Sequence, residues 1–257
     1  MALTAPSASI RWLSPDPALT AGRVARALGV PSRPGVEGSG FVIDLAGGRI
    51  EFVAVPPGGG QAADERLVLV ADDERAAAGA ATATVAGAAG LPPQLGIGWA
   101  TVDLERAAAL LGEWPSPALG EWPSPALGEW PSPAPADDLL GARAALVSGT
   151  PSIVLLEPNT EGRIAASLVR HAEGPAAIYV GFDGRGGFGG SRGFDGGSSH
   201  RFSAHLAALR EQAVRFSAPA SGPFGQAVAI AGGPAWGPHL VLVETDAAAP
   251  GTATIRP

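Results

Sequence analysis

Short runs of alternating apolar and polar residues recur along the chain, and stretches with helical spacing separate them. The first run predicts a strand over 8–14, and the next segment predicts a helix that Asp16 caps, with Pro17 at its first position. The runs 40–45 and 49–55 flank a glycine turn, which is typical of a hairpin. The chain therefore opens with a strand, a helix and a pair of antiparallel strands.

The same order returns twice. Residues 95–112 predict a strand and then a helix with Asp103 as its cap, and a second hairpin follows over 141–158. The other predicted elements are a strand at 66–73, a helix at 159–174, a strand at 175–182, a helix at 200–216, and strands at 226–233 and 239–246. Hairpins require antiparallel pairing, which excludes a doubly wound parallel sheet. We predict an α+β fold built from repeated βαβββ modules.

Two low-complexity segments interrupt this order. The motif GEWPSPA occurs three times in tandem over 112–134, and its prolines predict an exposed, extended segment. We interpret it as a duplication in a surface loop; the alternative is a proline-rich recognition motif built on Trp114, Trp122 and Trp130. The glycine-rich tract 181–199 is likewise interpreted as a loop insertion, against the alternative of an RNA-binding segment. If both loops bind partners, the protein is an interaction scaffold.

Composition and charge remove several classes of function. The chain of 257 residues has no Cys and no Lys, which excludes disulfides, thiolate sites and Schiff-base lysines. The net charge of −7 argues against nucleic-acid and membrane partners. No apolar run approaches the ~20 residues that span a bilayer, and residues 1–12 have neither the basic region nor the apolar core expected of a signal peptide. We therefore expect a cytoplasmic protein.

One segment carries a family resemblance. Residues 153–180, IVLLEPNTEGRIAASLVRHAEGPAAIYV, are similar to the centre of methylmalonyl-CoA epimerases, which belong to the vicinal oxygen chelate (glyoxalase, bleomycin-resistance and dioxygenase) superfamily. The stretch IGWATVDLERAAALL (97–111) resembles the opening of such a module. The resemblance implies βαβββ modules in a curved mixed sheet around a cavity. It divides the chain into an N-terminal module with a degenerate extension (8–94), a second module with the octapeptide insertion (95–158), and a linking helix with the third module (159–246).

The resemblance also implies where a metal would bind. In metal-dependent members, a His on the first strand of a module and a Glu on the last bind a divalent ion that chelates substrate oxygens. These positions hold Trp12, Trp99 and Ala177 on the first strands, and Glu51, Ile153 or Val154, and Val241 on the last strands. Of these, Glu51 alone is able to bind a metal. Glu157 and Glu244 stand three residues beyond Val154 and Val241, so strand alternation turns them to the opposite face.

The four histidines match none of these ligand positions. His200 and His205 are five residues apart, which does not suit a shared helical face, and His171 lies in a predicted helix. His239 begins the last predicted strand and is the histidine expected near the cavity. Its alternative interpretation is a polar residue at a strand end.

Two functions follow as hypotheses. In the first, the protein needs no metal and binds a small hydrophobic or aromatic molecule in a cavity lined by Trp12, Trp99, Ala177 and Val241, near Glu51 and His239. In the second, it is a metal-dependent lyase, epimerase or isomerase that uses Glu51 with further ligands and acts through a chelated enolate. The N-terminal module then pairs either with the degenerate region 66–95 or with a second subunit in a homodimer.

Overall fold

The structure is a computed structural model, and it describes nine stretches of the chain. These are residues 8–35, 40–45, 48–55, 64–70, 94–113, 132–147, 152–159, 161–182 and 198–244. The octapeptide segment 114–131 and the glycine-rich residues 183–197 lie outside them, and so do the three tryptophans of the octapeptide. Among the described helices, none has the length and hydropathy needed to cross a bilayer.

The N-terminal residues form a five-stranded mixed sheet. Its elements are β1 (Ala8–Ser14), α1 (Pro17–Leu28), β2 (Arg33–Pro34), β3 (Gly40–Leu45), β4 (Gly48–Ala54) and β5 (Arg66–Val70). The strand order is β2-β3-β4-β1-β5, with β1 parallel to β4 and antiparallel to β5. The predicted cap is confirmed, because Asp16 Oδ1 accepts the backbone N–H of Leu19 at 2.9 Å.

The rest of the chain forms an eight-stranded sheet from two modules. The first is β6 (Gln94–Ala100), α3 (Leu104–Glu113), β7 (Ser132–Asp137), β8 (Ala142–Val147) and β9 (Ser152–Pro158). After α4 (Arg163–His171), the second is β10 (Gly174–Gly181), α5 (Ser198–Glu211), β11 (Ala220–Gly222), β12 (Gly225–Ala229) and β13 (His239–Val243). The strand order is β11-β12-β13-β10-β6-β9-β8-β7, so the modules meet where β6 pairs antiparallel with β10.

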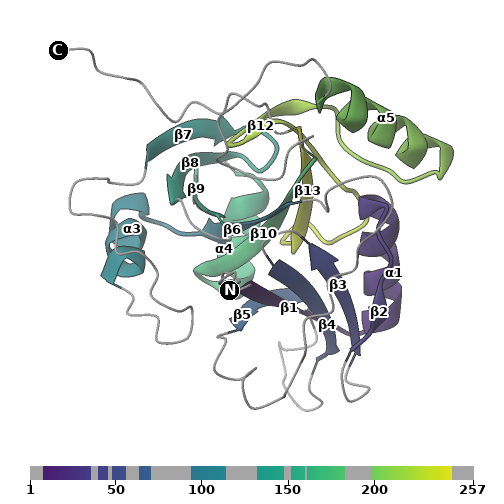
Figure 1. The fold of residues 1–257 in the computed structure, drawn as a ribbon. Helices are drawn as coiled ribbons and strands as arrows, with labels where there is room; N and C mark the ends of the chain where they lie inside the picture. Colours follow the sequence, from purple (N-terminus) through teal and green to yellow (C-terminus); the bar gives the residue numbers. More distant parts are fainter. Residues whose placement is uncertain are drawn as a thin grey trace, which may run out of the picture.

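This sheet curves until its two edges approach each other. The backbone N–H of Asp138, just after β7, donates to the carbonyl of Ser221 in β11 at 3.2 Å. Helix α4 lies inside the curve, against β6, β9 and β10 (Figure 1). In every module the first strand runs parallel to the last, as β1 does to β4, β6 to β9 and β10 to β13. The prediction of an α+β fold made of βαβββ modules around a curved mixed sheet is confirmed.

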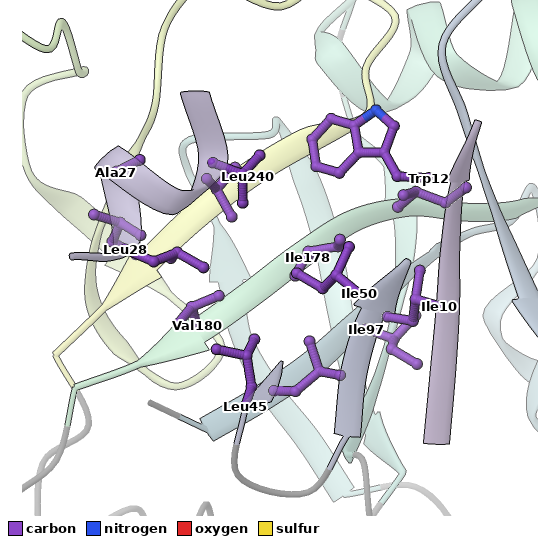
Figure 2. Close-up of a cluster of buried hydrophobic side chains, with 14 of the residues drawn as sticks. Ile10, Trp12, Ala27, Leu28, Leu45, Ile50, Ile97, Ile178, Val180 and Leu240 are labelled. Carbon is purple, nitrogen blue, oxygen red and sulfur yellow. The ribbon is translucent and has the colours of Figure 1, made fainter. Parts of the chain in front are cut away.

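An apolar layer joins the two sheets. Figure 2 shows Ile10 and Ile50 of the five-stranded sheet facing Ile97, Ile178 and Leu240 of the eight-stranded sheet. Helices α3 and α5 cover the same side of the eight-stranded sheet with buried Ala and Leu side chains. We call this side the outer face, and the opposite, concave side the inner face. Burying both faces of one sheet accounts for the nearly continuous apolar runs of β6, β9, β10 and β13.

The ends of the octapeptide segment belong to regular structure. Helix α3 continues to Glu113, and the last repeat enters β7 at Ser132. The predicted insertion is therefore shorter in the structure than 112–134. Strand β7 holds Pro133 and Pro135, and it can do so because it is the edge strand of the sheet, where a missing N–H leaves no ladder bond unmade.

Candidate functional site: the inner face of the eight-stranded sheet

The inner face is formed by alternate residues of the four central strands. Strand alternation places on this face Gly98, Ala100, Val154, Leu156, Ala177, Tyr179, Val241 and Val243. The strands are held in register there, since Gly98 lies opposite both Ala177 and Val154. The two modules thus bring together residues that are more than 140 positions apart in the chain, from Gly98 to Val241.

Side chains fill this hollow. Val154, Leu156, Ala177, Tyr179 and Val241 are each 0% exposed, so no water-sized space adjoins them. A Cβ built on Gly98 meets Ala177 Cβ at 2.8 Å, and it meets Leu156 Cδ1 and Tyr179 Cε2 at 2.9 Å each. The Tyr179 ring therefore lies directly against the backbone of β6, and glycine is required at position 98.

One polar pair lies within this apolar packing. The hydroxyl of Tyr179 on β10 donates to Asp137 Oδ2 at the end of β7, with 2.5 Å between the oxygens. Asp137 Oδ1 accepts the backbone N–H of Leu140 at 2.9 Å. Both side chains are completely buried. The pair spans the hollow from the central strand of one module to the edge strand of the other, and it holds the curved sheet closed.

Burial determines the protonation of this pair. It raises the pKa of Asp137, and the hydrogen bond from Tyr179 opposes part of that rise. Burial also raises the pKa of Tyr179 well above its ordinary value, and the neighbouring Asp137 carboxylate adds to the rise. Tyr179 is accordingly a neutral hydrogen-bond donor, and Asp137 is a carboxyl group whose charge is costly in this position.

A second polar group lies at the rim of the hollow, beneath α4. His239 begins β13 and is 6% exposed, and its Nε2 lies 3.4 Å from Ser167 Oγ on α4. Burial, and secondly the charge of Arg163, lower the pKa of His239 to about 4, so the imidazole is neutral at pH 7. The Ser167 hydroxyl has two carbonyl acceptors for its hydrogen bond, that of Trp236 at 2.8 Å and that of Arg163 at 3.0 Å. This arrangement attaches α4 to β13, and the Ser167 hydroxyl donates to a backbone carbonyl and not to the imidazole.

The structure brings together some of the residues singled out from the sequence. Ala177, Val241 and His239 share the inner face, because Ala177 lies opposite His239 and Val241 is two residues further along the same strand. Trp12 and Trp99 do not join them. Both pack on the outer-face side, where Trp12 is 1% exposed and stacks on Phe52 with 5.7 Å between ring centroids.

Glu51 is also remote from the inner face. It lies on β4 of the five-stranded sheet and pairs with Arg11 of β1, with 3.5 Å between Nε and Oε2. The expected cavity lined by Trp12, Trp99, Ala177 and Val241 therefore does not form. The reason is register: Trp99 shares its face with Leu95 and Ile97, so it points away from Gly98 and its neighbours.

Sequence reasoning missed Tyr179, Asp137 and Gly98. Tyr179 stands two residues after Ala177, and this spacing alone places it on the same face. Small residues alternate with large ones in LGIGWA (95–100), a pattern that leaves space on one face of β6 for a bulky neighbour. No local signal marks Asp137, because its partner lies 42 residues away.

The residues of the inner face do not fit a divalent metal. Such an ion needs several oxygen or imidazole ligands, and this face presents mainly methyl groups, glycine and the rings of Tyr179 and Phe224, with His239 as its one imidazole among the described residues. The oxygens of Asp137 already accept hydrogen bonds from Tyr179 and Leu140. Across the described stretches, no three His, Asp or Glu side chains converge to hold a metal ion.

Comparison with known proteins finds remote structural likenesses. No family model and no curated protein matches the chain. Methylmalonyl-CoA epimerase from Mycobacterium tuberculosis is 21% identical over 65% of this chain and 93% of its own, with a TM-score of 0.40. A Streptomyces coelicolor methylmalonyl-CoA epimerase, solved with 2-nitronate-propionyl-CoA, is 19% identical over 57% and 94%, with a TM-score of 0.35. A hypothetical protein from Bacillus halodurans is 18% identical over 57% and 89%, with a TM-score of 0.37.

Two of these three structures are methylmalonyl-CoA epimerases, the kind of protein that segment 153–180 resembles. Their identities and TM-scores are too low to carry an argument about activity. The architecture that the resemblance implied is seen instead in this chain's own topology, in which two βαβββ modules pair through their first strands into one curved sheet.

Proposed function

We propose that this protein binds a small apolar or aromatic molecule against the inner face of the eight-stranded sheet, without a metal ion. The observation that carries the proposal is the Tyr179–Asp137 pair, one buried polar contact in a wall of methyl groups and glycine. Ligand sites are concave and mostly apolar, with a few polar groups that fix orientation. A ligand with one hydrogen-bonding group on an aromatic body matches this pattern.

Phe224 is the group that such a ligand displaces. It lies in the turn between β11 and β12, and its ring packs edge-on against Tyr179 with 5.5 Å between centroids and 74° between planes. The ring is 6% exposed and belongs to the inner-face cluster. A turn moves more readily than a central strand, so exchange of the Phe224 ring for a ligand ring leaves the sheet intact.

The alternative, a metal-dependent lyase, epimerase or isomerase, is not favoured by these residues. Chelation of an enolate requires a cation held by several donor side chains. Where the family resemblance implies those donors, the inner face has Ala177 and Val241, and Glu51 belongs to the other sheet. We therefore propose no step through a metal.

The test uses indole and indene, which have the same shape and differ in the N–H group. Isothermal titration calorimetry is run on the wild type, on Phe224→Ala and on Phe216→Ala, which removes a ring from outside the inner-face cluster. Phe224→Ala is expected to bind indole more tightly than the wild type, because an apolar cavity of ring size accepts aromatic guests. The control is expected to match the wild type, and indole is expected to bind more tightly than indene through the polar pair.

Two results contradict the proposal. One is a Phe224→Ala protein that is folded by circular dichroism and binds neither probe. The other is near-stoichiometric nickel, cobalt, zinc or manganese, measured by elemental mass spectrometry after incubation and desalting of untagged wild type. The second result supports the enzyme alternative instead.

A further inference from the structure

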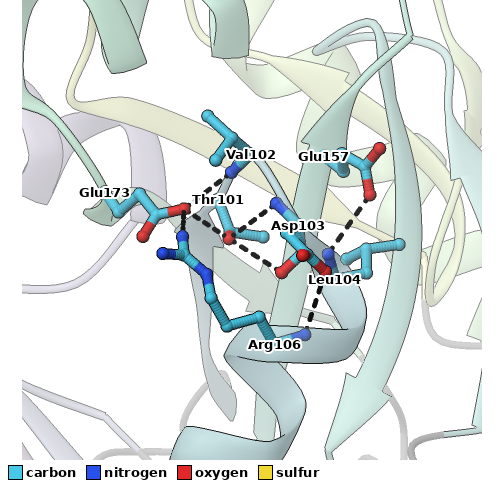
Figure 3. A network of polar contacts seen from close by, with 7 residues as sticks. All are labelled: Thr101, Val102, Asp103, Leu104, Arg106, Glu157 and Glu173. Atoms are coloured by element: carbon cyan, nitrogen blue, oxygen red, sulfur yellow. Dashed lines mark hydrogen bonds and ion pairs between the residues drawn. The ribbon is translucent and has the colours of Figure 1, made fainter.

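A network of polar contacts fixes the junction where the two modules of the eight-stranded sheet meet. Thr101 follows β6, and its Oγ1 accepts the N–H of Asp103 at 3.1 Å and donates to Glu173 Oε1 at 2.8 Å. Glu173 also accepts the N–H of Val102 at 2.8 Å and forms an ion pair with Arg106 of α3 (Figure 3). Glu173 stands immediately before β10, so this network attaches the first strand of one module to the helix of the other.

The five-stranded sheet contains the same network. Ser14 ends β1, and its Oγ accepts the N–H of Asp16 at 3.2 Å and lies 3.5 Å from Glu65 Oε1. Glu65 also accepts the hydroxyl of Thr20 at 3.1 Å and forms an ion pair with Arg23 of α1 at 3.2 Å. Glu65 stands immediately before β5.

The two networks correspond in their hydroxyl residue, their capping Asp and their Glu, whereas the paired Arg stands three residues after Asp103 in one and seven residues after Asp16 in the other. In both, a hydroxyl residue at the end of a first strand stands two residues before the Asp that caps the helix, as Ser14 does before Asp16 and Thr101 before Asp103. The antiparallel partner strand also starts at the same place in each, with Leu13 opposite Arg66 and Ala100 opposite Gly174. Strand β5 therefore occupies the same position beside β1 that β10 occupies beside β6.

We infer that β5 takes the place of the first strand of a second module. Glu65 holds β5 along the edge of β1, and without β5 this edge pairs with β1 of a second copy of this chain. First strands pair with first strands in this fold, as β6 does with β10 over seven register pairs. Antiparallel pairing of two such edges is self-complementary, which is the condition for a twofold-symmetric interface. Strand β5 covers β1 with five register pairs. At its N-terminal end Glu65 contacts α1, and the neighbouring Asp64 forms an ion pair with Arg170 of α4.

The experiment compares Glu65→Ala with Glu173→Ala. Both substitutions remove a junction carboxylate, but β10 is retained by a complete module, so the second is the matched control. Molar mass is followed by light scattering across a dilution series. Glu65→Ala is expected to reach twice the wild-type mass as concentration rises, while Glu173→Ala keeps the wild-type mass. Excess peptide of residues 64–70 is expected to return Glu65→Ala to the wild-type mass.

Hydrogen exchange separates the outcomes. If amides 66–70 of Glu65→Ala exchange freely and the mass stays at the wild-type value, the β1 edge is no dimerisation surface and the inference is overturned. If those amides remain as protected as in the wild type, Glu65 does not hold β5 and the inference is overturned as well. Should Glu65→Ala fail to fold, Arg23→Ala weakens the same junction from the helix side and is judged by the same criteria.

Discussion

Replacing Tyr179 by Phe tests the reading of the buried pair most sharply. The substitution removes the hydroxyl that donates to Asp137 Oδ2 at 2.5 Å and leaves the ring packed against Gly98. A hydrogen bond to a charged acceptor contributes about 1.5–3 kcal/mol, and one to a neutral acceptor about 0.5–1.5 kcal/mol. We therefore expect Tyr179→Phe to lower the free energy of unfolding by about 2 kcal/mol when Asp137 is ionised and by about 1 kcal/mol when it is protonated.

The sign of the pH dependence follows from the direction of the pKa shift. Burial raises the pKa of Asp137, so its contribution to stability is complete below the unfolded-state pKa and is lost as pH rises through the folded-state pKa. Without the Tyr179 hydroxyl, which lowers this pKa, the folded-state value rises further and the loss is greater. The destabilisation caused by Tyr179→Phe is accordingly larger at about pH 8 than at about pH 4.

Urea unfolding at both pH values, followed by tryptophan fluorescence, gives the two free energies. The control is Tyr179→Phe made in an Asp137→Asn background. With a neutral residue at position 137, the effect of the Tyr179 substitution is expected to be the same at both pH values. A pH-dependent effect that persists in that background contradicts the assigned role of Asp137, and so does a Tyr179→Phe substitution that leaves the free energy of unfolding unchanged at both pH values.

Three further predictions concern single positions. Gly98→Ala is expected to lower the free energy of unfolding by about 1–3 kcal/mol, because its Cβ overlaps neighbours at 2.8–2.9 Å, and thermal unfolding measures this; an unchanged midpoint contradicts it. His239 is expected to titrate at a pKa of about 4 in NMR spectra. The free energy of unfolding then falls as pH drops from the ordinary histidine pKa towards that value, and titration of His239 near the ordinary value contradicts its burial. The Val102 N–H lowers the pKa of Glu173, so the stabilisation lost in Glu173→Gln is present near neutral pH and vanishes as pH falls through the folded-state pKa; calorimetry that finds an equal loss at acid pH disproves it.

The fold was accessible from the sequence because its signals are local. Asp16 and Asp103 cap helices that begin one residue later, and both hairpins are bounded by turn residues in the chain itself. The recurrence of strand, helix and hairpin then predicted βαβββ modules. The pairing of strands from different parts of the chain has no local sequence signal, so the β6–β10 and β1–β5 junctions could not be predicted.

The site was harder to predict because it depends on strand faces and on distant partners. Trp99 was expected to line the cavity, yet Gly98 and Ala100 on either side of it occupy the inner face. A shift of one residue along a strand moves every side chain to the other face, so an error of one residue in the alignment to a family motif assigns the wrong residues to the cavity. Asp137 and Tyr179 come into contact because the sheet is curved, and no sequence pattern near either residue predicts this contact.

The most direct test of the central claim is an NMR titration of ¹⁵N-labelled wild-type protein with indole, followed by a separate titration with nickel. We expect indole to shift the amide signals of Ala177, Tyr179, Phe224 and Val241 together, and nickel to leave them unchanged. Nickel-induced broadening at those same amides, or indole shifts confined to the surroundings of Trp12 and Trp99, contradicts a metal-independent apolar site on the inner face.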